Sequence, residues 1–199
     1  MTNTSYFFSV AFVLLLMSQL FMAYRTSNIE SPNYIVVKSF EKFEIRNYPA
    51  MNIAQTVMNS DGYKESSSNG FRTVANYIFG GNKENKKIAM TSPVIMEIGD
   101  DSKMSFVMPK EHSYENLPEP NSANVELLKI QPKTYAVIAF TGFANDEKIE
   151  KYSKMLLHCM KVENLKPIGA IQYLGYNPPW QVLGRTNEVA VEVVYSKKL

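Results

Sequence analysis

Cysteine, tryptophan and histidine are scarce in this chain of 199 residues, which holds one Cys, one Trp and two His. A single cysteine, Cys159, excludes an intramolecular disulfide and a cysteine-rich metal site. Cys159 lies between Leu156, Met160 and Val162 in an apolar helical pattern. We therefore interpret it as a small buried hydrophobic residue and not as a reactive thiol.

An excess of charge of either sign is also missing. The chain has 21 Lys and Arg against 19 Asp and Glu, a net charge of +2. A nucleic-acid-binding protein normally carries a basic excess or stripe, so this class is not expected. Hydrophobic residues make up 45% of the chain, which excludes a disordered protein. The length suits one domain with a sizeable core.

The sequence offers no recognisable metal or catalytic constellation. His158 shares a basic helix face with Lys154 and Lys161, and His112 lies in a proline-flanked loop, so both are predicted to be solvated. The two histidines have no metal-ligand spacing, and no phosphate-binding glycine loop or nucleophile elbow occurs. The acidic residues are dispersed along the chain. We therefore assign no catalytic residue and no metal ligand.

The N-terminus carries an uncharged stretch of 18 residues from Tyr6 to Ala23. This length lies between the core of a signal peptide and a membrane span of about 20 residues. No base precedes the stretch, and the best cleavage point, after Ala23, has a bulky residue two positions earlier. Arg25 follows it, and the positive-inside rule keeps that side in the cytoplasm. We expect residues 1–25 to be either an uncleaved membrane anchor or a removed signal peptide, followed by a polar linker at 26–33.

Residues 34–199 are predicted to form the main domain, in which one order of elements occurs twice. The first half has strands, a helix and two more strands, and the second half repeats this order with weak sequence similarity. The expected strands are Tyr34–Lys38, Phe43–Tyr48, Met51–Val57, Ile88–Ile98, Met104–Met108, Val125–Ile130, Tyr135–Phe140, Ala170–Leu174 and Val189–Tyr195. Most connections are too short for a crossover, which predicts antiparallel pairing.

The two expected helices are amphipathic. In the first, Phe71, Val74, Ala75 and Ile78 follow the i, i+3, i+4, i+7 pattern of one apolar stripe, and two glycines at 80 and 81 end it. The second runs from about Asp146 to Val162, with Ile149, Tyr152, Leu156 and Met160 on one face. One helix for each half suits a single barrel built from two related units.

Three motifs, in this order, carry a family resemblance. The first is the glycine-closed helix Gly70–Asn82, the second is the segment KIAMTSPVIM at Lys87–Met96, and the third joins Gly175–Trp180 to Gly184–Val189. Together they resemble the SOUL/heme-binding protein family, over roughly residues 33–195. The resemblance implies an α+β fold, a distorted antiparallel β-barrel flanked by two helices with a pseudo-two-fold internal duplication. It also implies non-covalent binding of heme or related tetrapyrroles.

A flat tetrapyrrole needs apolar walls and a few basic or amide groups near its propionates. The first helix and the Tyr176–Trp180 loop could supply the walls. The family's shallow cleft between this helix and a C-terminal loop, carried onto this chain, implicates Phe71, Ala75, Asn76, Trp180 and Gln181. Asn76 and Gln181 are uncharged, so Arg72 or Arg185 would have to pair with a propionate. The full set of predicted binding residues is Phe71, Arg72, Val74, Ala75, Asn76, Ile78, Trp180 and Gln181.

The leading functional hypothesis is a carrier or buffer of heme or porphyrin, without an enzymatic activity, in which affinity comes from apolar contact and not from iron ligation. The alternatives are a binding module or a hydrolase for another flat amphipathic molecule, and a membrane-tethered interaction domain without a small ligand. Fold alone does not choose among them. The N-terminal stretch predicts a membrane-associated protein or one that enters the secretory pathway or reaches the exterior.

Overall fold

The structure is a computed structural model that describes residues 2–58, 63–99 and 102–195. The described residues form the α-helices α1 (Thr2–Ser27), α2 (Tyr63–Ile78) and α3 (Asp146–Val162), and a short 3-10 turn at Tyr114–Asn116. The strands are β1 (Ile35–Ser39), β2 (Glu44–Tyr48), β3 (Met51–Val57), β4 (Val94–Ile98), β5 (Lys103–Val107), β6 (Glu126–Ile130), β7 (Lys133–Thr141), β8 (Pro167–Gly175) and β9 (Thr186–Val193).

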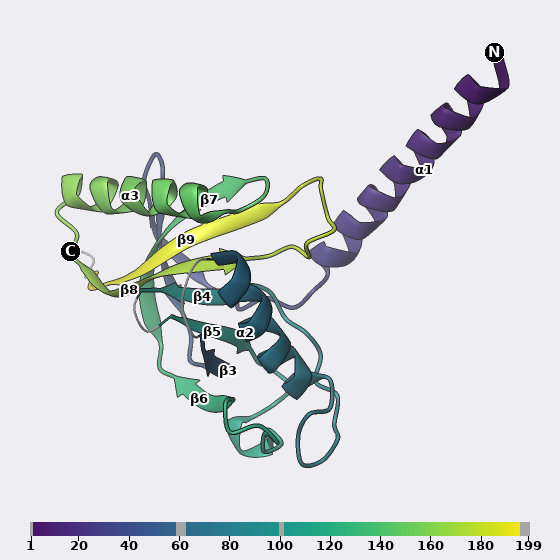
Figure 1. Ribbon diagram of the computed structural model, residues 1–199. Coiled ribbons are helices and arrows are strands. Elements are labelled where there is room, and N and C mark those ends of the chain that lie inside the picture. Colours follow the sequence, from purple (N-terminus) through teal and green to yellow (C-terminus); the bar gives the residue numbers. More distant parts are fainter. Residues whose placement is uncertain (1, 59–62, 100–101, 196–199) are drawn as a thin grey trace.

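All nine of these strands join one antiparallel sheet in the order β1-β2-β7-β9-β8-β4-β5-β3-β6. Exchanging β2, β3, β4 and β5 with β6, β7, β8 and β9, respectively, turns the order from β2 to β6 into the same order read from the opposite end. The predicted pseudo-two-fold duplication is therefore present in the topology. The sheet curls into a half-barrel, which confirms the predicted α+β fold of a distorted antiparallel barrel (Figure 1).

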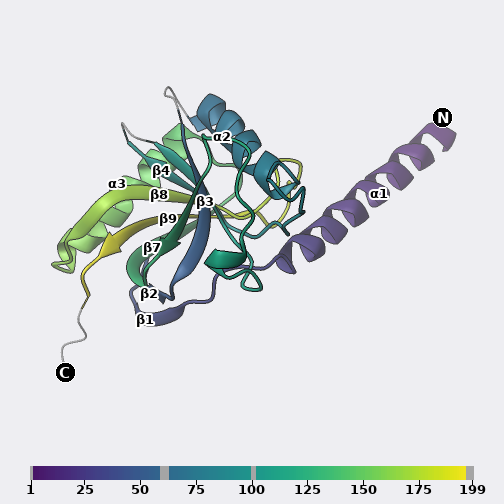
Figure 2. The same cartoon turned by 90° about the horizontal axis from the view of Figure 1, so that it is seen from below.

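Helices α2 and α3 cover the same face of the sheet (Figure 2). Helix α2 packs on β3 and β5, and α3 packs on β7, β8 and β9. The core lies between these layers and contains fully buried side chains from both helices, such as Val74 and Leu156, and from the strands, such as Phe106 and Val189. Alternation along the strands sends the intervening side chains to the opposite, concave face.

Most strand boundaries differ from the prediction by one to three residues; β9, for example, begins at Thr186 and not at Val189, and β7 at Lys133 and not at Tyr135. Strand β4 begins at Val94 and not at Ile88, because Pro93 lacks the amide N–H that a central strand needs. Strand β8 begins at Pro167 and not at Ala170, and its pairing with β9 shifts register between Ile168 and Gln172. Propensity alone does not show such irregular pairing.

Helix α1 projects away from the sheet and its two covering helices (Figure 1). Its segment Tyr6–Thr26 has 21 residues, is apolar and long enough to cross a membrane, and is not buried against the domain. It is therefore not a core helix of this fold. Length and composition are equally those of a signal sequence near the N-terminus.

Candidate functional site

Helix α2 presents an aromatic ridge to solvent, formed by the exposed Phe71 and Phe79 with the buried Ala75 between them. These residues follow at i+4 spacing and lie along one side of the helix. Phe79 extends the last turn, because its N–H donates to the Ala75 carbonyl at 3.0 Å. The side chains of Phe71 and Phe79 are 37% and 59% exposed, and the small Ala75 lies between them. Eight residues of helical rise separate the two rings by about 12 Å, so one flat macrocycle could contact both.

The Phe71 ring packs against the sheet on one side. It lies 5.2 Å from the ring of Phe106 in a tilted arrangement, which fixes its orientation on the sheet. Arg72 is exposed beside it and can reach an anionic group at the edge of a ligand. The ridge therefore combines aromatic surface with one cation.

Asn76 takes part in the hydrogen bonding that ends α2. Its backbone carbonyl accepts a hydrogen bond from the Gly81 N–H at 2.8 Å. A Cβ at Gly81 would lie 2.5 Å from the Asn76 side-chain nitrogen and 2.6 Å from that carbonyl oxygen, so only glycine allows this close approach. The predicted role of Gly81 in ending the helix thus has a steric basis.

Three of the predicted binding residues face the core. Val74, Ala75 and Ile78 are buried, with Val74 fully so, and they belong to the cluster that joins α2 to the sheet. Their contacts position the ridge, while Phe71, Arg72 and Asn76 stay exposed. Whether the ridge binds a ligand stays a prediction.

The other two predicted residues lie in the β8–β9 loop, residues 176–185, which contacts α1. The Trp180 indole N–H donates to the Met22 sulfur at 3.2 Å, while the rest of the side chain is largely exposed. Gln181 is buried: its amide oxygen lies 2.9 Å from the Thr26 hydroxyl, and its amide nitrogen donates to the Leu183 carbonyl at 2.9 Å. The structure thus gives Gln181 a role in holding the loop.

Arg185 organises the same loop from inside. Its guanidinium donates to the carbonyls of Pro178 and Gln181 at 2.6 and 2.7 Å, and to that of Asn177 at 3.4 Å. It also lies over the ring of Phe143, 4.4 Å from the centroid. Arg185 is buried and engaged with backbone, so it is not available for a propionate in this arrangement.

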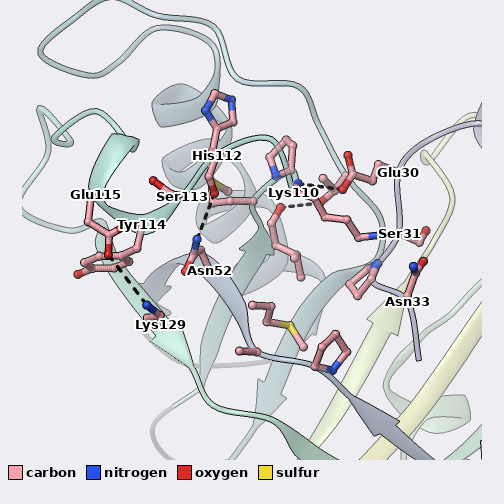
Figure 3. Close-up of a pocket in the computed structure, with 18 residues that line it drawn as sticks. Glu30, Ser31, Asn33, Asn52, Lys110, His112, Ser113, Tyr114, Glu115 and Lys129 are labelled. Carbon is pink, nitrogen blue, oxygen red and sulfur yellow. Dashed lines mark hydrogen bonds and ion pairs between the residues drawn. The ribbon is translucent and has the colours of Figure 1, made fainter. Parts of the chain in front are cut away.

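A hollow of about 290 Å³ lies on another side of the domain, where three segments distant in sequence meet (Figure 3). It is lined by residues 30–33, 49–52, 107–110 and 112–115, with Thr91 and Lys129. Its rim carries both signs of charge: Lys129 lies 4.0 Å from Glu115, and the Lys110 backbone N–H donates to Glu30 at 2.9 Å. The volume is at the lower limit of ligand pockets, which is roughly 300 Å³.

The two histidines do not converge on a site. The His112 carbonyl accepts a hydrogen bond from the Asn52 amide at 3.2 Å, and its imidazole points away from Asn52 (Figure 3). The prediction that His112 is solvated is wrong, because its side chain is only 10% exposed and its Nε2 lies 3.5 Å from the Glu111 carboxylate. His158 is exposed on α3. Across residues 2–58, 63–99 and 102–195, no group of three or more His, Cys, Asp or Glu side chains could hold a metal ion.

The concave face of the sheet contains a buried ion pair. Arg46 donates to Glu188 at 2.9 Å and to Glu44 at 2.8 Å, and the Tyr176 hydroxyl donates to the other oxygen of Glu188 at 2.6 Å. Burial opposes the charge of Arg46, but the attraction of Glu188 raises its pKa overall. Burial, together with the negative charge of Glu188, also raises the pKa of Tyr176. Both groups therefore keep their usual protonation at neutral pH.

Beside this pair lies a small hollow of about 100 Å³. Apolar and aromatic side chains such as Ile95, Leu174, Tyr48 and Tyr135 line it, together with the carboxylate of Glu97, whose oxygen accepts a hydrogen bond from the Gln172 amide at 3.2 Å. Burial raises the pKa values of Tyr48 and Tyr135 to about 12. Lys133 also lines this hollow, but it is already paired with Glu192.

Sequence reasoning missed several of these features. Phe79 is not among the predicted binding residues, because it comes after the last residue of the amphipathic stripe and directly before two glycines. Its position four residues after Ala75 is the signal that indicates the ridge. Glu188 and Arg46 are 142 positions apart, and only the pairing of β2, β7 and β9 brings them together.

Solved structures with the same arrangement define the fold class. The C-terminal domain of EcmrR superposes with a TM-score of 0.61 at 8% identity, covering 78% of this chain and 98% of that one. A hydrolase from Listeria innocua superposes with a TM-score of 0.56 at 10% identity, covering 79% and 94%. At such identities the likeness concerns the fold alone.

Sequence comparison is more specific. The model of the SOUL heme-binding protein family matches residues 29–192, and the chain belongs to this family. Heme-binding protein 2 of Mus musculus and that of Homo sapiens are each 27% identical over 156 residues, covering 74% of this chain and 76% of theirs. Heme-binding protein 1 of Xenopus laevis is 23% identical over 155 residues, covering 74% and 81%. The predicted family is confirmed, and its name and the relatives' names describe heme binding and not a catalysed reaction.

Proposed function

We propose that this protein binds heme or a related porphyrin reversibly and acts as a carrier or buffer for it. The observation that carries the proposal is the family match over residues 29–192, together with relatives named for heme binding. The described residues present an exposed aromatic ridge and no histidine-based metal cluster. These features support a site in which apolar contact with the face of the macrocycle supplies the affinity.

The proposed binding surface is the α2 ridge with the exposed residues beside it. Phe71 and Phe79 contact the macrocycle face, Arg72 pairs with a propionate, and the small, buried Ala75 leaves the space between the two rings unfilled. Val74 and Ile78 act by fixing α2 on the sheet. Trp180 and Gln181 remain predicted participants, and we expect Trp180→Ala to weaken hemin binding at least several-fold in the titration below if their loop contacts the ligand.

Titration of the purified full chain with hemin, followed by absorbance in the Soret region, tests this surface. An aromatic contact contributes about 0.5–1.5 kcal/mol beyond area burial, and 1.4 kcal/mol corresponds to a tenfold change in Kd. We expect Phe71→Ala and Phe79→Ala each to weaken hemin binding several-fold, and Arg72→Gln to weaken it less.

The matched control is Val162→Ala, which truncates an exposed apolar side chain at the end of α3 and should leave the affinity unchanged. Lys110→Ala/Lys129→Ala probes the hollow of Figure 3. If that double variant lost hemin while the α2 variants kept full affinity, the ligand would bind in the hollow and the ridge assignment would be wrong. Absence of any saturable hemin binding would contradict the proposed function itself.

The concave hollow favours a second candidate function, binding of another flat amphipathic molecule. Its tyrosines and aliphatic side chains lie beside Glu97, and the lining Lys133 is already paired with Glu192, so the hollow suits a neutral or cationic ligand better than a dianion. A hydrolase would need a general acid or base in this hollow, and Glu97 is the carboxylate that lines it, since both oxygens of the neighbouring Glu188 are already engaged. Saturable binding of such a compound, abolished by Glu97→Gln and unaffected by Phe71→Ala, would favour this candidate.

The proposed setting for the carrier is a membrane surface. The α1 segment Tyr6–Thr26, whose only charged residue is Arg25 near its end, has the length and composition of a span, and its exposure leaves it free to enter lipid. Flotation of the full chain with lipid vesicles, followed by N-terminal sequencing of the protein made in cells, distinguishes an anchor from a cleaved signal.

A further inference from the structure

The last two turns of α1 are attached to the β8–β9 loop. Gln19, Met22 and Thr26 lie on one side of the helix and contact the loop at successive heights. The Gln19 amide oxygen accepts the Val182 N–H at 2.9 Å, the Met22 sulfur accepts the Trp180 indole N–H, and the Thr26 hydroxyl lies 2.9 Å from the Gln181 amide oxygen. The loop therefore rises alongside the helix for about 10 Å.

The free part of α1 is too short to cross a bilayer alone. Between Tyr6 and Ser18 there are 13 residues, which span about 20 Å, whereas the hydrocarbon core is about 30 Å thick. The whole segment Tyr6–Thr26, with 21 residues, spans about 32 Å and is sufficient. If α1 crosses the membrane, its last two turns lie at or within the lipid, and the attached loop must lie there too.

The loop has the chemistry that this position requires. Residues 176–184 contain no charged side chain. Trp180, Val182 and Leu183 are exposed by 62%, 55% and 43%, and an indole prefers the interface between lipid and water. Phe143, half-exposed over Arg185, extends this apolar surface.

Several backbone groups of the loop are also hydrogen-bonded within the protein, which lowers the cost of placing them in lipid. Arg185 binds three loop carbonyls, the Gln181 side chain binds the Leu183 carbonyl, and Gln19 accepts the Val182 N–H. In water, solvent molecules could form the hydrogen bonds to these backbone groups. In lipid, only the protein can supply them, so the network suits a loop at the membrane.

We infer that α1 is retained in the mature protein and that the β8–β9 loop inserts Trp180, Val182 and Leu183 into the interfacial layer of the same membrane. This inference rests on the membrane anchoring proposed above. The loop then acts as a second, shallow contact that fixes the domain against the lipid surface. Removing α1 by cleavage would leave the contacts at Trp180, Gln181 and Val182 without partners.

Trp180 is the only tryptophan of the chain, so its fluorescence reports on this loop alone. The experiment reconstitutes the full chain in phosphatidylcholine vesicles and compares ordinary lipids with lipids brominated along the acyl chain. We expect blue-shifted emission, strong quenching by bromine placed near the headgroup end, and weak quenching by iodide in the water phase. Val182→Glu/Leu183→Glu should reduce the bromine quenching while the protein stays in the vesicle fraction.

The control variant, Trp180→Phe/Val162→Trp, moves the single indole to the exposed end of α3, on the side of the domain away from α1 (Figure 1). Its fluorescence should not be quenched by the brominated lipids and should be quenched strongly by iodide. Full-length protein that floats with vesicles but shows the control's quenching pattern would overturn the loop insertion and leave the anchor intact. Protein that does not float, or that loses α1 during synthesis, would overturn the anchoring as well.

Discussion

Arg46 and Glu188 show how a single buried pair constrains the concave face. Their side chains are 8% and 7% exposed, and each charge is compensated by the other at 2.9 Å. Removing one partner of such a pair typically costs about 3–5 kcal/mol, because the remaining charge stays buried without compensation. We therefore expect Arg46→Met to lower the free energy of unfolding, measured by urea denaturation, by several kcal/mol.

The double variant Arg46→Met/Glu188→Gln is the control for this prediction, since it removes both charges. It should recover much of the lost stability. If the single variant unfolded at the same urea concentration as the native protein, the pair would be solvated in solution and not buried.

Single residues also mark the limit of what the sequence predicts. The stripe of Val74, Ala75 and Ile78 was predicted as a helix face, and the structure places it in the core. An apolar stripe of this periodicity occurs both in helices that pack on a core and in helices that line a ligand site. The pattern predicts which residues share a helix face, but it does not predict what covers that face. Phe79 and Glu188 depend on neighbours supplied by other elements.

At the scale of elements, local capping explains where α3 begins. Asn145 precedes the helix in an extended conformation, and its side-chain oxygen accepts the Lys148 N–H at 2.9 Å. Loss of such a cap costs about 1 kcal/mol. We expect Asn145→Ala to lower the free energy of unfolding by about this amount in a thermal or urea melt, whereas Asn145→Asp should retain the native stability. Equal destabilisation by both variants would contradict the capping role.

The elements themselves were the most predictable part of the fold. Both amphipathic helices and the alternating strands have local signatures, and α3 was predicted with the bounds that it has. The start of β4 and the shifted register of β8 were not predicted, because the first depends on the position of Pro93 and the second on the partner strand β9. The attachment of α1 to the β8–β9 loop joins residues more than 150 positions apart and has no local signal.

At the scale of the whole molecule, the two halves are interleaved and not adjacent. Three strand pairs join the two halves: β2 with β7, β3 with β6, and β4 with β8.

A fragment of residues 34–123 would expose three strand edges and part of the core. We expect it to be unfolded or aggregated when expressed alone, as judged by circular dichroism and gel filtration. A soluble fragment with a sharp thermal transition would contradict a single cooperative domain.

The central claim, that face contact and not iron ligation holds the ligand, is tested most directly by comparing hemin with metal-free protoporphyrin. Both are titrated into the native full chain and into His112→Ala/His158→Ala, with vesicles or detergent alone as the blank. If apolar contact dominates, the two ligands bind with similar Kd values, and the double variant keeps its affinity for both. Loss of hemin binding and of the Soret shift in the histidine variant, together with no binding of the metal-free porphyrin, would show an axial-ligand site and contradict this account.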